Sequence, residues 1–135
     1  YHPGYPASDI WITSNLRIIH GNRVKSKGST AHIYLNESKT SVIYGHIHRI
    51  ERAHRTRQDH DGVSEIMAAS PGCLARTDGA VPSTNQGMDL DGRPMTRSED
   101  WQQGIAVVTA VGDEWDYEQV RIENGRCWYR GQRYG

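Results

Sequence analysis

A chain of 135 residues is long enough for one domain with one hydrophobic core and too short for two. Its 16 basic and 16 acidic residues balance to a net charge of zero, so overall charge does not draw it to nucleic acid or to an anionic membrane. No apolar run approaches the roughly 18–20 residues that span a bilayer, and no signal peptide is visible, so we expect no membrane partner and a cytoplasmic location. Cys73 and Cys127 are too few for a disulfide framework and are expected to be free thiols.

The first part of the chain predicts a strand–helix–strand unit. Prolines and a glycine make residues 1–15 a poor beginning for a regular element. Residues 16–20, "LRIIH", are typical of a short apolar strand. Residues at helical spacing then predict a helix within 29–39, "STAHIYLNESK", with Ser29 or Thr30 as N-cap. Residues 40–45, "TSVIYG", indicate a buried strand. Two such strands joined by a helix should lie parallel, through a right-handed crossover.

The remainder of the chain predicts strands separated by one long connection. Residues 49–57 and 63–70 favour extended chain, and residues 75–103 form a polar stretch too long for an ordinary connection. Alternating patterns with tight turns between them, one an Asn-Gly pair, then predict antiparallel hairpins built from 104–111, 115–123 and 126–134. We therefore expect a single domain over 1–135 of the α/β class: mostly β, a mixed sheet with one crossover helix, and C-terminal antiparallel hairpins.

Three histidines stand at predicted strand ends. His20 ends the first strand, and His46 and His48 follow Gly45 directly after the second. In extended backbone, residues i and i+2 project to the same side, so His46 and His48 should point at one spot. A parallel crossover brings both strand ends to one edge of the sheet, where ligand sites of open α/β sheets lie. Imidazole is the commonest protein ligand for transition metals, although each histidine could instead be an ordinary polar residue at a strand end.

The motifs "IIHGN", "VIYGHIHR" and "AASPGCL" together resemble the C-terminal half of the calcineurin-like metallophosphoesterases, of a phage or bacterial type. The resemblance implies half of a β-sandwich that carries a site for two divalent transition metals, with manganese, iron, zinc or nickel as candidates. It also implies that His20 and His46 bind the second metal and His48 the first. The remaining histidines match no ligand position and are interpreted as structural: His2, His32, His54 and His60.

The chain departs from this family in one large respect. The resemblance implies an Asp-x-His pair, a bridging aspartate in Gly-Asp-x-x-Asp and an Asn-His pair, and none of them occurs before His20. The stretch "GDEWD", 112–116, spells the second motif, but it stands between two antiparallel strand patterns, where Gly-Asp is ordinary turn chemistry. We therefore expect a C-terminal portion whose partner is the missing N-terminal half, and which by itself hydrolyses phosphoesters poorly.

The substrate is indicated only by residue type. The cluster that follows the histidines, Arg49, Arg52, Arg55 and Arg57, could contact a phosphoester or a nucleic-acid backbone, although solvated or paired arginines fit as well. The C-terminal aromatic residues are expected to pack the hairpins: Trp101, Trp115, Tyr117, Trp128 and Tyr129. The hypothesis is a metal-dependent phosphoesterase. Its alternative is a non-catalytic β-rich binding module whose histidines are relics or hold a structural ion.

Overall fold

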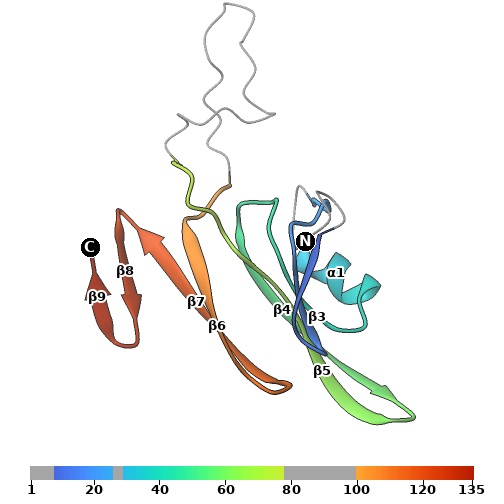
Figure 1. Cartoon of the computed structure of the whole chain (residues 1–135). Coiled ribbons are helices and arrows are strands. Elements are labelled where there is room, and N and C mark those ends of the chain that lie inside the picture. Colours follow the sequence, from blue (N-terminus) through green and yellow to red (C-terminus); the bar gives the residue numbers. More distant parts are fainter. Residues whose placement is uncertain (1–7, 26–28, 78–99) are drawn as a thin grey trace, which may run out of the picture.

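The structure, a computed structural model, describes residues 8–25, 29–77 and 100–135 (Figure 1). Within these ranges the chain forms nine strands and one helix, in the order β1 (Asp9–Thr13), β2 (Leu16–Ile19), α1 (Ala31–Glu37), β3 (Ser41–Tyr44), β4 (Ile50–Asp59), β5 (Gly62–Pro71), β6 (Gly104–Val111), β7 (Glu114–Glu123), β8 (Arg126–Tyr129) and β9 (Gln132–Tyr134). The predicted fold class, mostly β with one crossover helix and C-terminal hairpins, is confirmed.

The first sheet has five strands in the order β1-β2-β3-β5-β4. Strands β2, β3 and β5 are parallel to one another, as the strand–helix–strand prediction requires for the first two, while β1 and β4 run antiparallel to their neighbours. All three parallel strands therefore end at the same edge. Strand β3 is buried along its whole length because it lies in the middle of the sheet, with a layer packed on each face.

Strand β1 corrects the expectation that residues 1–15 hold no regular element. Asp9–Thr13 pairs with β2 as a hairpin, with Ile10 opposite Ile18 and Trp11 opposite Arg17. The reason lies in "DIWIT", where β-branched and aromatic residues favour extended backbone once the proline-rich start of the chain has passed. Residues 1–7, which include His2, lie outside the described part of the chain.

Helix α1 packs on one face of the first sheet through a core of helix and strand residues: Ala31, Tyr34, Leu35, Val42, Tyr44, Ile47, Ile66 and Ala68. Of the predicted caps, Thr30 holds the N-cap position but its side chain makes no capping bond. The Glu51 carboxylate, which comes from β4, accepts the Ala31 N–H at 3.1 Å and the Ser29 hydroxyl at 3.4 Å instead. A distant strand thus satisfies a helix terminus that local sequence was expected to satisfy.

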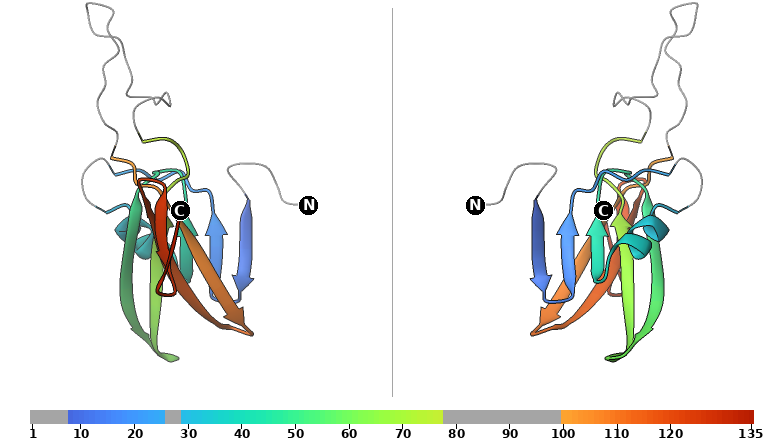
Figure 2. Two further views of the ribbon diagram at one scale, coloured as in Figure 1. Left: turned by 90° about the vertical axis from the view of Figure 1, so that its left-hand side faces the viewer. Right: turned by 90° about the vertical axis from the view of Figure 1, so that its right-hand side faces the viewer.

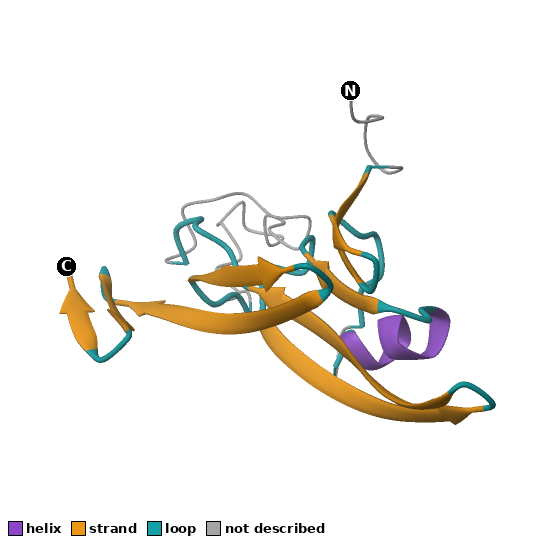
Figure 3. Cartoon of the chain, turned by 60° about the horizontal axis from the view of Figure 1, so that its bottom comes forward, coloured by secondary structure: helices purple, strands orange, loops and turns teal. Residues whose placement is uncertain are grey.

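The second sheet, in the order β6-β7-β8-β9, packs on the opposite face of the first. Tyr117 of β7 lies in a second core with four residues of the first sheet: Leu16, Ile43, Met67 and Ala69. Figure 2 shows the resulting three layers from either side, with α1 and the second sheet on opposite faces of the five-stranded sheet. The hairpin β8–β9 lies farthest from α1 and extends past the first sheet (Figures 1 and 3).

Two hairpin turns in the second sheet have two consecutive residues with positive φ. Asn124-Gly125 joins β7 to β8 as predicted, with φ of 52° and 72°. Arg130-Gly131, at 50° and 76°, splits the predicted strand 126–134 into two, because positive φ at both residues suits a two-residue turn.

Three further expectations concern loops, cysteines and membrane spans. Most of the predicted long loop, 75–103, lies outside the described residues, which resume at Asp100. Cys73 and Cys127 are free, as predicted. Among the described residues, no helix is long and apolar enough to cross a membrane.

Candidate metal centre

Two of the three predicted histidines lie side by side where the parallel strands end, a region we call the histidine edge. His20 follows β2 and His46 follows β3, and the N–H of Gly45 donates to the His20 carbonyl at 2.9 Å, so the strand ladder continues past the last assigned pair. Nδ1 of His46 lies 3.3 Å from Nε2 of His20, and the rings meet edge to face with their centroids 5.3 Å apart. Parallel topology therefore brings together two residues that are distant in the sequence.

The distance between these nitrogens suits two ligands of one ion. Two nitrogens bound to a tetrahedral zinc ion at about 2.0–2.1 Å are roughly 3.3–3.4 Å apart. With their protons on the other ring nitrogens, two neutral imidazoles would each have a lone pair on the facing nitrogen. With one proton moved to the facing side, the same distance is a hydrogen bond, so the tautomers decide which role the pair has.

The backbone conformation at His48 differs from the predicted one. The prediction assumed extended backbone, but His46 and His48 have φ of 70° and 58°, in the left-handed region. The buried side chain of Ile47 and the bond from its N–H to the Gly45 carbonyl, 2.8 Å, hold this tight turn. The His48 ring packs edge-on against Trp101, with centroids 4.5 Å apart. The extended backbone on which the i and i+2 argument rests is therefore absent at His46 and His48.

The left-handed conformation is costly for residues other than glycine. Such backbone costs of order 1–3 kcal/mol per residue and persists only where the surroundings impose it. Both left-handed positions carry histidine and not glycine, and the nearby glycine, Gly45, stands directly before them. The left-handed backbone at these two histidines is therefore a feature that the surrounding structure imposes on the turn, and it is independent of the distance between the rings.

A hollow of about 340 Å³ adjoins the histidine edge. Its lining comes from β1, from the ends of all three parallel strands and from the residues beside them: Ser8, Ile10, Ile18, Ile19, His20, Ile43, Tyr44, Gly45 and Pro71. Ile18 and Ile43 belong to the core that faces the second sheet, and Ile19 and Tyr44 to the core that faces α1, so the hollow lies at the end of the sheet where the parallel strands finish. The turn after β5 was expected to border the same mouth as the histidines, and Pro71 does so.

A buried ion pair holds the turn that carries the histidines. Arg49 and Glu51 are 3.0 Å apart, and each side chain is only 12% exposed. Glu51 also accepts the Tyr44 hydroxyl at 2.9 Å, while Arg49 donates to the Lys25 carbonyl at 2.9 Å. Burial, and then the Glu51 carboxylate, raise the pKa of the Tyr44 hydroxyl well above its usual range. Residues on both sides of His46 and His48 are therefore fixed to α1 and to the loop that precedes it.

The other three arginines of the predicted phosphate cluster also have partners within the chain. Arg57 donates to the carbonyls of Leu35 and Ser38, at 3.0 and 2.6 Å, at the C-terminal end of α1. Arg55 donates to the Asn36 side chain at 2.6 Å. Arg52 donates to a ring nitrogen of His54, and its guanidinium lies 5.3 Å from the centre of the Tyr117 ring. These contacts favour the structural interpretation of the cluster.

The "GDEWD" turn lies at the opposite end of the first sheet. Asp113 accepts the Ser14 N–H at 2.9 Å, and Trp115 donates to the Asn15 side chain at 2.8 Å. Asn15 and His20 stand at opposite ends of β2, roughly 16 Å apart for five extended residues. The bond from Ser14 holds the pKa of the Asp113 carboxyl below its usual range. This carboxylate serves a contact between two turns, and Asp116 is exposed on the face of β7 opposite Tyr117.

A second cluster of metal-ligand types lies in the turn between β4 and β5. Asp59, His60 and Asp61 are the one group of three such residues, among those the structure describes, with ligand atoms all within 4.8 Å of one another. His60 was not among the predicted ligands and was interpreted as a structural histidine. His60 and Asp61 are 89% and 81% exposed, and the Asp61 N–H donates to the Asp59 carboxylate at 3.0 Å, which is ordinary turn chemistry. The three predicted histidines do not form such a preassembled group.

Two aromatic residues differ from their predicted role. Trp115 and Tyr117, which were expected to pack the hairpins, pack the β6–β7 hairpin against the first sheet. Trp101 instead contacts His48, and Trp128 is 66% exposed on the hairpin that extends past the first sheet. Neither position could be predicted from the strand pattern, because both depend on how the two sheets meet.

Comparisons with protein-family models, with curated proteins and with solved structures find no match to this chain.

Proposed function

We propose that this chain carries part of the metal site of a metal-dependent phosphoesterase that hydrolyses a phosphomonoester or a phosphodiester. His20 and His46 would bind one divalent transition ion, and His48 would serve as a ligand of a second. The observation that supports this proposal is the separation of 3.3 Å between Nε2 of His20 and Nδ1 of His46 where two parallel strands end. The resemblance in "IIHGN" and "VIYGHIHR" supports the reaction class.

In this proposal, the chain's own residues would bind the metal ion and orient the reacting phosphoryl group beside it. A bound divalent ion would polarise a phosphoryl oxygen and lower the pKa of a bound water. The two strands fix both imidazoles in position, and the apolar walls of the adjoining hollow, Ile10, Ile18 and Ile43, would limit the access of bulk water to the reacting group. Manganese, iron, zinc and nickel all accept imidazole ligands.

The donor set suits one ion better than two. Two unit charges 4 Å apart interact by about 4 kcal/mol at an effective dielectric constant near 20, and two dications by about four times as much. Neutral imidazoles offset none of this repulsion, and Asp113 is bound to Ser14 at the other end of β2. We therefore propose that the bridging carboxylate comes from a separate segment, the N-terminal half that the resemblance implies. Without that segment, hydrolysis should be poor.

Metal titration tests the proposal directly. Co²⁺ absorption and calorimetry should detect about one ion per chain, with weak affinity, and both His20→Ala and His46→Ala should abolish binding because each removes one of two ligands. His32→Ala, on the exposed face of α1, and His60→Ala, in the acidic turn, are matched controls and should bind as the unaltered chain does.

Loss of binding in His60→Ala with retention in His20→Ala would overturn the assignment and place the ion in the turn between β4 and β5. The alternative function, a non-catalytic module with a structural ion, predicts a different result. The ion would then raise the unfolding temperature, but no addition of the N-terminal half would produce hydrolysis of a nitrophenyl phosphodiester.

A further inference from the structure

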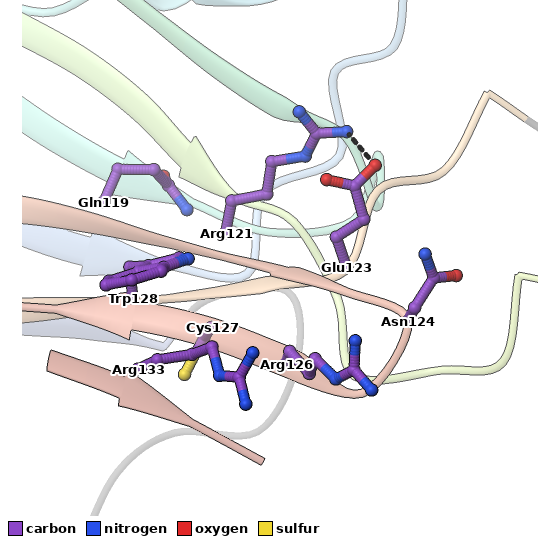
Figure 4. Close-up of a pocket in the computed structure, with 8 residues that line it drawn as sticks. All are labelled: Gln119, Arg121, Glu123, Asn124, Arg126, Cys127, Trp128 and Arg133. Carbon is purple, nitrogen blue, oxygen red and sulfur yellow. Dashed lines mark hydrogen bonds and ion pairs between the residues drawn. The ribbon is translucent and has the colours of Figure 1, made fainter.

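The C-terminal end of β7 and the hairpin β8–β9 form a shallow groove of about 520 Å³, which we call the arginine groove. Its lining residues are Gln119, Arg121, Glu123, Asn124, Arg126, Cys127, Trp128 and Arg133 (Figure 4). The dashed line in Figure 4 marks an ion pair between Arg121 and Glu123, with nitrogen and oxygen 3.3 Å apart. The metal-site hypothesis uses none of these residues.

The groove lies on the face of the second sheet that is turned toward the first. Along β7, side chains alternate between faces, so Gln119, Arg121 and Glu123 share the face of Tyr117, which is buried against the first sheet. Pairing extends this face to the hairpin, because Arg126 stands opposite Glu123 and Arg133 opposite Trp128. The packed core thus continues into a stretch of the same sheet face that the first sheet does not cover.

Positive charge is concentrated in the arginine groove. It contains three guanidinium groups and one carboxylate, whereas the chain as a whole is neutral. Within the described part of the chain, Arg126 and Arg133 have no ion-pair partner, in contrast to the four arginines near the histidines. Guanidinium groups without a carboxylate partner are suited to phosphate, whose oxygens match their planar fork.

Trp128 adds an aromatic platform to the charge. Its side chain is 66% exposed and stands on a strand, flanked on β9 by Arg133. An indole on a sheet face stacks on a nucleobase of any kind, and arginines beside it neutralise the backbone; this combination is typical of surfaces that bind single strands. An acidic protein segment would satisfy the arginines but would leave the flat face of the indole without a matched partner.

We propose that the arginine groove binds single-stranded nucleic acid, with Arg126 and Arg133 on backbone phosphates and Trp128 stacked on a base. The groove adjoins the hollow at the histidine edge: Gln119, which lines the groove, donates to the carbonyl of Pro71, which lines the hollow, at 3.1 Å. A strand held in the groove would therefore lead toward His20. The statement that this strand is the substrate rests on the proposed function, whereas the binding does not.

Fluorescence anisotropy of a labelled oligothymidylate, measured with the 135-residue chain at low salt in EDTA, tests the binding without any metal. The variant Arg126→Ala/Arg133→Ala should weaken binding at least tenfold and reduce the slope of log affinity against log salt by about 1.4, which is about 0.7 for each lost phosphate contact. Trp128→Ala should weaken binding roughly 5- to 100-fold. An oligouridylate arm shows whether the strand is DNA or RNA.

Arg23→Ala/Lys39→Ala is the matched control, because it removes the same charge beside α1, on the far side of the first sheet. The control should bind the oligonucleotide as the unaltered chain does, and the folds of all variants are checked by circular dichroism. Equal losses in both double variants, no effect of Trp128→Ala, or stronger competition by an acidic polypeptide than by oligothymidylate would each overturn the proposal. Binding here together with no Co²⁺ binding would refute the metal site alone.

Discussion

At the end of the five-stranded sheet where β2, β3 and β5 finish, His20 and His46 face each other across 3.3 Å. At the other end, Asp113 accepts a backbone N–H from Ser14, and the Asp61 N–H is satisfied by Asp59. Both ends carry residue types that bind metals. The acidic residues close or connect turns, and their carboxylates already accept backbone N–H groups. His20 and His46 instead face each other, and His46 lies in left-handed backbone that it does not favour.

The two ends of the sheet differ in how firmly the surrounding contacts hold their ligand-type residues. At the histidine edge, a buried ion pair and a buried tyrosine hydroxyl converge on the turn, so that its strained backbone is held from several sides. At the opposite end, the contacts are exposed: Asp113 joins two turns through one hydrogen bond, and Asp59 bonds within its own turn. We infer that residues of metal-ligand type indicate a binding site only where buried contacts hold their backbone in an otherwise unfavourable conformation.

Removing the buried ion pair between Arg49 and Glu51 should have the largest effect on stability. Glu51→Ala should lower the free energy of unfolding by about 3 kcal/mol, because it removes the close, buried partner of the Arg49 guanidinium and leaves only the exposed Asp100 carboxylate, at 3.9 Å. It also removes the acceptor of the Ala31 N–H at the start of α1. Urea unfolding followed by circular dichroism measures the change.

Glu65→Ala is the control, because Glu65 also pairs with a basic side chain, His54, but is 63% exposed. Its cost should stay within about 1 kcal/mol. If the two substitutions were equally harmless, the buried ion pair would not support the histidine edge, and the contrast between the two ends would fail.

The strained backbone at His46 predicts an inverted order of two substitutions. In ordinary strands, glycine is less stable than alanine by roughly 0.5–1 kcal/mol. At His46, with φ of 70°, glycine should be the more stable by about 1 kcal/mol, because it has no Cβ to oppose left-handed backbone. Thermal unfolding of His46→Gly and His46→Ala measures the difference, with Thr56→Gly and Thr56→Ala on exposed β4 giving the usual order.

Both His46 variants should lose Co²⁺ binding to the same extent, since each lacks the imidazole. A normal order at His46, with alanine the more stable, would mean that the turn is not left-handed in solution. Backbone strain would then give no support to a site at His46. The separation between the His20 and His46 nitrogens would still be tested by the Co²⁺ titration.

Most strands could be predicted because their physical causes are local. β-Branched and aromatic residues favour extended backbone in β5, β6 and β7, and Asn124-Gly125 favours a turn. Strand β1 was within reach of the same reasoning, through "DIWIT", but the prolines and glycine before it dominated the prediction. The pairing of His20 with His46 was also predictable, because it follows from a parallel crossover alone.

What could not be predicted depends on contacts between distant segments. The cap of α1 comes from Glu51, which lies 20 residues beyond the N–H it accepts. The left-handed turn at His46 and His48 depends on burial of Ile47, and glycine rather than histidine is the usual sign of such backbone. The exposure of Trp128 follows from the hairpin β8–β9 extending past the first sheet, which no pattern within the strand records.

The smallest expected effect belongs to the acidic end of the sheet and depends on pH. The bond from Ser14 holds the pKa of Asp113 below the ordinary 3.8, so the folded state favours the carboxylate. The unfolded chain binds the proton more readily, so the contribution is fully present above the unfolded pKa and is lost as pH falls through the lower folded value. Asp113→Asn keeps an acceptor oxygen but removes the charge, so its deficit in unfolding free energy should exist at neutral pH and vanish in strong acid.

Urea unfolding from neutral pH to about pH 2 measures this deficit, which should be small because the carboxylate is exposed and screened by water. Asp116→Asn, three residues away on the outer face of β7, is the control and should show no such pH-dependent deficit. A deficit in Asp113→Asn that grew on acidification would reverse the sign of the linkage and contradict the bond to Ser14. If Asp113→Asn also abolished Co²⁺ binding, then Asp113 would contribute to the metal site. The interpretation of the acidic end of the sheet as purely structural would then be wrong.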